Sequence, residues 1–69
     1  MKQEYSIQYR PFSEWMNTSS PGLGYQSLNK AKTEAILLKQ KTGLSYRVVK
    51  REINDMGLTS KETIVVKRI

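Results

Sequence analysis

Residues 5–10 alternate apolar and polar side chains, which is the period-2 pattern of a half-buried β-strand. The alternation predicts that one set of side chains faces the core and the other faces away from it, namely Tyr5, Ile7 and Tyr9 inward and Ser6, Gln8 and Arg10 outward. Pro11 ends this strand, because proline has no N–H to donate to a neighbouring strand.

Residues 27–42 carry the pattern of an amphipathic helix. Ser27 suits the N-cap, and Gly43 suits the left-handed position that follows a last turn. Lys39 and Lys41 fall in that last turn, where the helix dipole favours cations. An arc of about 80° holds the apolar stripe expected to face the core, which consists of Leu28, Ala31, Ala35 and Leu38.

Two more strands are predicted in the second half of the chain. Residues 44–53 and 63–69 are rich in β-branched and aromatic side chains, which favour strands. Residues 54–57 read Asn-Asp-Met-Gly and supply turn chemistry between them, with Gly57 able to adopt a positive φ. The tight turn predicts that these two strands are antiparallel neighbours.

Residues 11–26 form a connection that is long for a compact domain. The connection is too apolar for a simple linker, so part of it is expected to pack down, and Ser13 could cap a short helical turn there. Trp15, the single tryptophan, is expected either to cover the core or to anchor a partner.

The order of elements predicts one α+β domain over residues 1–69. The predicted sheet has three strands, is mainly antiparallel, and is covered on one face by the helix. Its spatial order is 1-3-2, a split βαβ, with residues 63–69 in the middle and the first two strands running the same way. The alternative places the first strand beside the second, in parallel.

The chain is small, and only 38% of it is hydrophobic. Cores of domains below about 70–80 residues rarely supply more than about 3–5 kcal/mol of stability. Either one sheet and one helix pack economically, or a partner such as a second copy of the chain completes the core.

The composition excludes several classes of function. The chain has neither cysteine nor histidine, so disulfides, thiol nucleophiles and the commonest general base and metal ligand are absent. The six carboxylates are scattered, and no stretch approaches the ~18 apolar residues of a membrane span. We therefore expect a cytoplasmic, non-enzymatic protein that uses no cofactor or metal and does not enter a membrane.

The net charge of +6 is concentrated in one segment, since residues 27–50 carry six cationic side chains against Glu34 alone. A local positive charge favours a polyanionic partner, and nucleic acid leads. The residues expected to contact it are Lys39, Lys41, Arg47, Lys50, Arg51, Lys67 and Arg68. The 1-3-2 order gathers most of them where the helix ends, together with Lys2, and places Arg10, Lys50 and Arg51 at the opposite end.

A second hypothesis is recognition of a protein, with an acidic surface as one form of it. Leu37 points away from the apolar stripe of the helix, and Trp15 lies in the long connection. Together with an uncovered sheet face, these two side chains could form an apolar contact surface.

A resemblance bears on the same question. The succession of a Tyr-Ser-Ile-Gln-Tyr-Arg strand, an alanine-bearing helix and a Tyr-Arg-Val-Val strand, over residues 4–52, resembles small proteins encoded by phages and prophages. The resemblance lies in the types of strand and helix and carries no functional residue across. It implies a protein that binds nucleic acid or host machinery in the host cytoplasm.

Overall fold

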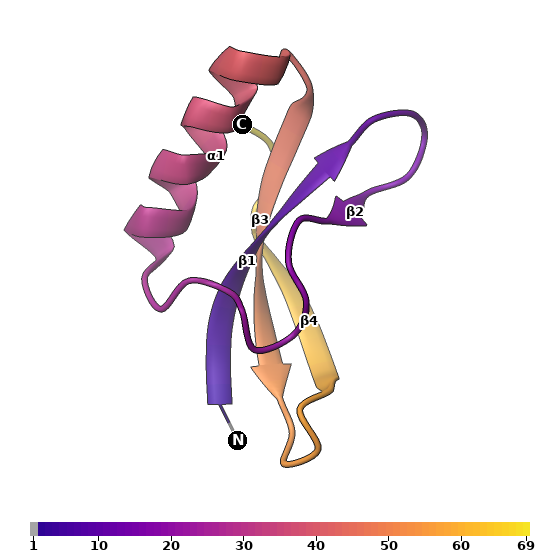
Figure 1. The fold of residues 1–69 in the computed structure, drawn as a ribbon, viewed down its shortest axis with the longest axis vertical. Helices are drawn as coiled ribbons and strands as arrows, with labels where there is room; N and C mark the ends of the chain where they lie inside the picture. The colour runs from indigo at the N-terminus through magenta and orange to yellow at the C-terminus, as the bar shows by residue number, and fades with distance from the viewer. Residues whose placement is uncertain (1) are drawn as a thin grey trace.

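The computed structural model describes residues 2–69 as one helix packed on one sheet (Figure 1). The elements along the chain are β1 (Lys2–Arg10), β2 (Met16–Asn17), α1 (Leu28–Thr42), β3 (Ser45–Ile53) and β4 (Thr59–Val66). All neighbouring strands are antiparallel, in the order β2-β1-β3-β4, and α1 packs on β1 and β3. The predicted α+β class and the single helix on one face are confirmed.

The predicted strand order is wrong. β1 pairs with β3 over its whole length, from Lys2 opposite Ile53 to Arg10 opposite Ser45, and β4 lies at the edge of the sheet. The order of the three predicted strands is therefore 1-2-3 and not the 1-3-2 of a split βαβ. The parallel alternative is also wrong, because β1 and β3 run in opposite directions.

The connection between β1 and α1 explains this difference, because it carries the chain back along β1 before the helix begins (Figure 1). Its first part, β2, pairs with the end of β1. Tyr25, near its end, exchanges two backbone hydrogen bonds of 2.7 Å with Tyr5. α1 then runs in the same direction as β1, and β3 returns antiparallel to both. No helical turn follows Ser13, where the chain bends toward β2 instead.

The helix is positioned as its sequence predicts. Ala31 and Ala35 are fully buried and lie against Ile7, Tyr46 and Val48. The core also takes in the partly buried side chains of Tyr5, Tyr9, Leu28 and Leu38. The small alanine side chains allow the helix to approach β1 and β3 closely, which defines the helix face of the sheet.

The two ends of α1 differ in how well they match the prediction. Gly43 adopts the left-handed conformation, with φ of 73°, and its N–H donates to the Lys39 carbonyl. Ser27 occupies the N-cap position, but its side chain makes no capping hydrogen bond. No helix in residues 2–69 has the length and apolar character needed to cross a membrane.

The opposite face of the sheet, which we call the loop face, is also buried along β1. Glu4, Ser6 and Gln8 lie on it and are buried, although the alternating pattern placed Ser6 and Gln8 outward. Residues 18–24, which we call the return loop, contribute to this burial and hydrogen-bond to the backbone of Ile7 and to the side chains of Glu4 and Arg51. The prediction that the sheet face opposite the helix is open is therefore wrong for β1 and β3.

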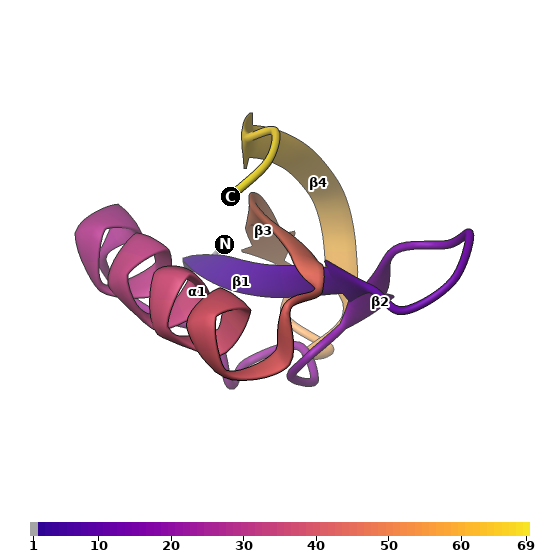
Figure 2. The same ribbon diagram turned by 90° about the horizontal axis from the view of Figure 1, so that it is seen from above.

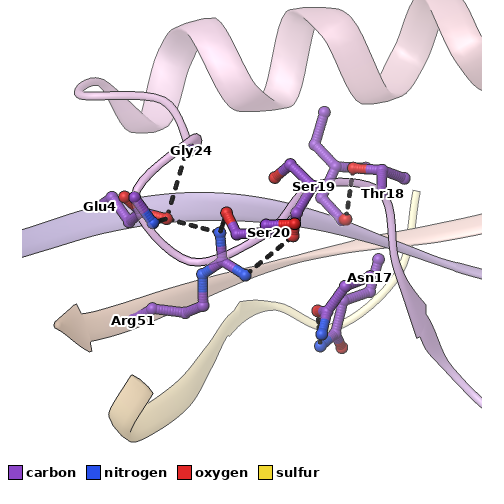
Figure 3. Close-up of polar contacts among 10 residues, drawn as sticks. Glu4, Asn17, Thr18, Ser19, Ser20, Gly24 and Arg51 are labelled. Atoms are coloured by element: carbon purple, nitrogen blue, oxygen red, sulfur yellow. Dashed lines mark hydrogen bonds and ion pairs between the residues drawn. The ribbon is translucent and has the colours of Figure 1, made fainter. Parts of the chain in front are cut away.

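The return loop is held by a buried ion pair between Glu4 and Arg51, which lie opposite each other on β1 and β3 (Figure 3). Arg51 Nη2 lies 2.5 Å from Glu4 Oε2, and the two side chains are 1% and 0% exposed. The same guanidinium donates to the carbonyls of Ser19 and Ser20, each at 3.1 Å.

Glu4 holds the other half of the return loop. Its Oε2 accepts hydrogen bonds from the backbone N–H groups of Gly22 and Gly24, each at 3.1 Å. One carboxylate oxygen thus joins β1, β3 and the return loop. A buried charge is tolerated only when it is paired and hydrogen-bonded. Glu4 Oε2 meets both conditions, whereas Glu4 Oε1 and Arg51 Nε are buried without a hydrogen-bond partner among the described residues.

β4 forms the outer edge of the sheet and starts earlier than predicted, at Thr59 rather than residue 63. Its pairing with β3 is interrupted by register shifts at two places. Figure 2 shows β4 arching away from β3, on the side opposite the helix. Its side chains are mostly exposed, including Ile64 and Val65, and a second copy that covers them stays a prediction.

Replacing Gly24 with alanine should destabilise the fold. A Cβ at this position would lie 2.6 Å from the Tyr5 carbonyl oxygen and 2.7 Å from Glu4 Oε2. We expect a loss of about 1–3 kcal/mol in the free energy of unfolding, measured by urea denaturation. Leu23→Ala, at the exposed neighbouring position, is the control and should change the value by less than about 0.5 kcal/mol. Equal stability of the two variants would contradict the close approach.

Removing one partner of the buried pair should cost more. Arg51→Met leaves the Glu4 carboxylate buried without its cation, which typically costs about 3–5 kcal/mol. A domain of this size has little more stability than that, so we expect the variant to be largely unfolded by circular dichroism at 25 °C. Lys50→Met, one residue earlier on the same strand, should stay folded. A folded Arg51→Met variant with the same melting temperature as the wild type would show that the ion pair between Glu4 and Arg51 is dispensable.

Candidate nucleic-acid interface

Half of the lysine and arginine side chains gather at one end of the molecule, which we call the basic end. Here β1 and α1 finish, β3 begins, and the chain that follows β4 crosses over the start of β3. The cationic residues of this end are Arg10, Lys39, Lys41, Arg47, Lys67 and Arg68.

The last residues of the chain tie the basic end together. The Ile69 N–H donates to the Tyr46 carbonyl at 2.7 Å, and Ile69 packs against the core. Lys39 Nζ donates to the Ile69 carbonyl oxygen at 2.8 Å. These contacts bring the end of α1 and the chain after β4 to the same place, so their cationic side chains are neighbours.

Three arginines of this end surround Ser45 on the loop face, and we call them the arginine cluster: Arg10, Arg47 and Arg68. Arg10 lies opposite Ser45 in the pairing of β1 with β3, and directly opposite residues have Cβ atoms roughly 5 Å apart. Arg68 Nη2 donates to the Ser45 hydroxyl at 3.3 Å. Arg47 is two residues further along β3, about 7 Å away on the same face. The three arginines are therefore neighbours on the loop face.

Arg47 is held in place by two contacts. Its Nε donates to Gln8 Oε1 at 2.7 Å, and its guanidinium lies over the Trp15 ring, 4.5 Å from the ring centroid. Gln8 is fixed in turn, since its amide donates to Asn17 Oδ1 at 2.8 Å and to Glu62 Oε1 at 3.0 Å. No residue among those described hydrogen-bonds to the two terminal nitrogens of Arg47, so the fixed guanidinium keeps donors for a ligand.

The stack with Arg47 bears on one of the two expected roles of Trp15, that of covering the core. Trp15 is half-buried, lies outside the apolar core cluster, and contacts a cation on the loop face. It does not cover the core. Its ring instead belongs to the same surface as the arginine cluster.

The other residues expected at the interface are distributed unevenly. Lys39, Lys41, Arg47, Lys67 and Arg68 do share the basic end. Arg51 is buried against Glu4 and is not available to a partner. Lys50 lies on the helix face, in a shallow groove lined also by Gln3, Glu52, Lys61 and Thr63.

The antiparallel pairing also corrects the positions of two residues near the N-terminus. Lys2 lies opposite Ile53, at the end of the molecule away from the arginine cluster. Arg10 belongs to the basic end, where the 1-3-2 order did not place it. A feature of the sequence could have placed Arg10 correctly. The polar residues Asn17 and Thr18 follow the bend that begins at Pro11, so this segment can pair with β1 and carry the chain back along it.

The charges around the arginine cluster favour an anion. Among the described residues, no ion pair joins these arginines to a carboxylate, and Glu62 is linked to Arg47 only through Gln8. Guanidinium groups bind phosphate and carboxylate oxygens through two parallel hydrogen bonds. In residues 2–69, no group of three His, Cys, Asp or Glu side chains is arranged to hold a metal ion.

Arg47→Ala should loosen Trp15, because the guanidinium covers one face of the indole ring. We expect greater quenching of the tryptophan fluorescence by acrylamide, and a loss of about 0.5–1 kcal/mol in unfolding free energy. Lys50→Ala, on the same strand but the helix face, should leave the quenching unchanged. Identical quenching curves for wild type and Arg47→Ala would contradict the stack.

A comparison of the chain with protein-family models, curated proteins and solved structures finds no match.

Proposed function

We propose that the protein is a non-enzymatic nucleic-acid-binding protein and that the basic end contacts the phosphate backbone. The observation that carries the proposal is the arginine cluster, in which Arg10 lies opposite Ser45, Arg68 donates to the Ser45 hydroxyl, and Arg47 is two residues further along β3. Arg47 is already held by Gln8 and Trp15, so little side-chain freedom is lost when it binds an anion.

The distribution of charge supports an extended polyanion over a small anion. The arginine cluster lies on the loop face, whereas Lys39 extends from the end of the helix and contacts Ile69. Lys41 and Lys67 are exposed at the same end. Cations spread over both faces of one end can meet successive phosphates of one strand, and a single phosphate would use only the cluster.

The second candidate is a phage-type modulator that docks on a host protein through Trp15 and Leu37. Leu37 is 42% exposed on the outer side of α1. Trp15 lies on the loop face, so the two side chains belong to different surfaces of the molecule. The structure therefore favours the nucleic-acid proposal, and protein docking is an outcome that the following experiment can detect.

The double variant Arg10→Glu/Arg68→Glu should lose nucleic-acid binding. Both side chains are exposed, so the fold should be retained. We expect at least a tenfold loss of affinity for a mixed-sequence 20-nucleotide oligonucleotide, measured as single strand and as duplex by fluorescence anisotropy. The slope of log K against log salt should fall by about 1–2, because two phosphate contacts are removed.

Lys30→Glu/Lys32→Glu is the matched control, because it changes the net charge equally on the first half of α1. Its affinity should stay within about threefold of the wild type. Equal losses in the two double variants would mean that only net charge matters. If the wild-type protein binds neither form of the oligonucleotide, the proposal fails. A partner whose binding is insensitive to salt and lost with Trp15→Ala would instead support protein docking.

A further inference from the structure

The bend between β1 and β2 exposes an aromatic side chain next to the arginine cluster. Phe12 is 91% exposed, two residues after Arg10 and three residues before Trp15. Figure 1 shows this bend as a loop that projects from the body of the molecule. A phenylalanine this exposed contributes almost nothing to the core, and its ring is accessible to a ligand.

A shallow hollow lies beside Phe12. Pro11, Phe12, Ser13, Glu14 and Met16 line it. The lining is largely apolar and contains one carboxylate and no cation. A phosphate would be repelled from this hollow by Glu14, whereas a planar base could stack on Phe12 and donate an amino hydrogen to the carboxylate.

We propose that this hollow takes an unpaired base, so that the protein prefers single-stranded nucleic acid to a duplex. The inference rests on the proposed function: the arginine cluster holds the backbone, and Phe12 stacks on a base that follows along the strand. Bases within a duplex are stacked on each other and do not present their faces to a protein. A projecting aromatic side chain beside a phosphate site therefore adds affinity for the single strand only.

The test compares a mixed-sequence 20-nucleotide DNA single strand with its duplex at one salt concentration, by anisotropy. We expect the wild type to bind the single strand at least tenfold more tightly. Phe12→Ala should lower the single-strand affinity about tenfold, the size typical of one lost base stack, and should leave duplex affinity within twofold. Phe12→Tyr should retain the preference, because it keeps an aromatic ring.

Met56→Ala is the matched control, since Met56 is an equally exposed apolar residue in the turn between β3 and β4, at the other end of the molecule. It should change neither affinity. Equal wild-type affinity for single strand and duplex, or a Phe12→Ala variant that binds the single strand like the wild type, would overturn the inference while leaving backbone binding intact. Binding to neither form would overturn the proposed function as well.

Discussion

The Glu4 carboxylate is the constraint on which the rest of the structure depends. It receives the Arg51 guanidinium from β3 and two backbone N–H groups from the return loop, all at one buried oxygen. These contacts hold the return loop against β1 and β3. A return loop that left the sheet would leave Glu4 paired with Arg51 but would remove the Gly22 and Gly24 N–H groups from the carboxylate and the Ser19 and Ser20 carbonyls from the guanidinium, and hydrogen bonds to charged groups are among the stronger ones.

The path of the return loop also determines where the residues of the candidate interface lie. Because the return loop runs back along β1, α1 starts beside Tyr5 and β3 descends antiparallel to β1. That direction alone puts the last residue of β1 opposite the first residue of β3. Arg10 and Arg47 thereby share a face, and the chain after β4 brings Arg68 to the same point. The arginine cluster is a consequence of the register, since its members are far apart in sequence.

The sequence predicts what depends on local periodicity. The helix over residues 28–42, its Ala31 and Ala35 contact face, and the left-handed Gly43 all follow from spacing and from glycine's conformational freedom. Strand order does not follow in the same way. The pattern of residues 11–26 predicts only an irregular connection and does not show in which direction it runs. The preference for a right-handed crossover applies only when the connected strands are parallel, so it could not be used to find the strand order here.

The same dependence on strand pairing explains which site residues could be placed correctly from the sequence. The lysines of the helix end and the last basic residues of the chain were placed together correctly, because both depend only on where elements finish. Arg10 and Lys2 were assigned to the wrong ends and Arg51 was expected to be available to a partner, because the surroundings of all three depend on the partner strand. Arg51 in particular reads as one more surface cation, and only its pairing with Glu4 across 47 positions shows that it is structural.

The central claim is that Arg10, Arg47 and Arg68 form one anion-binding surface while Arg51 is a buried structural residue. The most direct measurement is an NMR titration that follows the four arginine Nε–H resonances and the Trp15 indole N–H as single-stranded DNA is added. The signals of Trp15 and the three clustered arginines should shift together with one affinity, and the Arg51 signal should not move. Unchanged signals of the clustered arginines at DNA concentrations that saturate binding, or a shift of Arg51 with the other three, would contradict this.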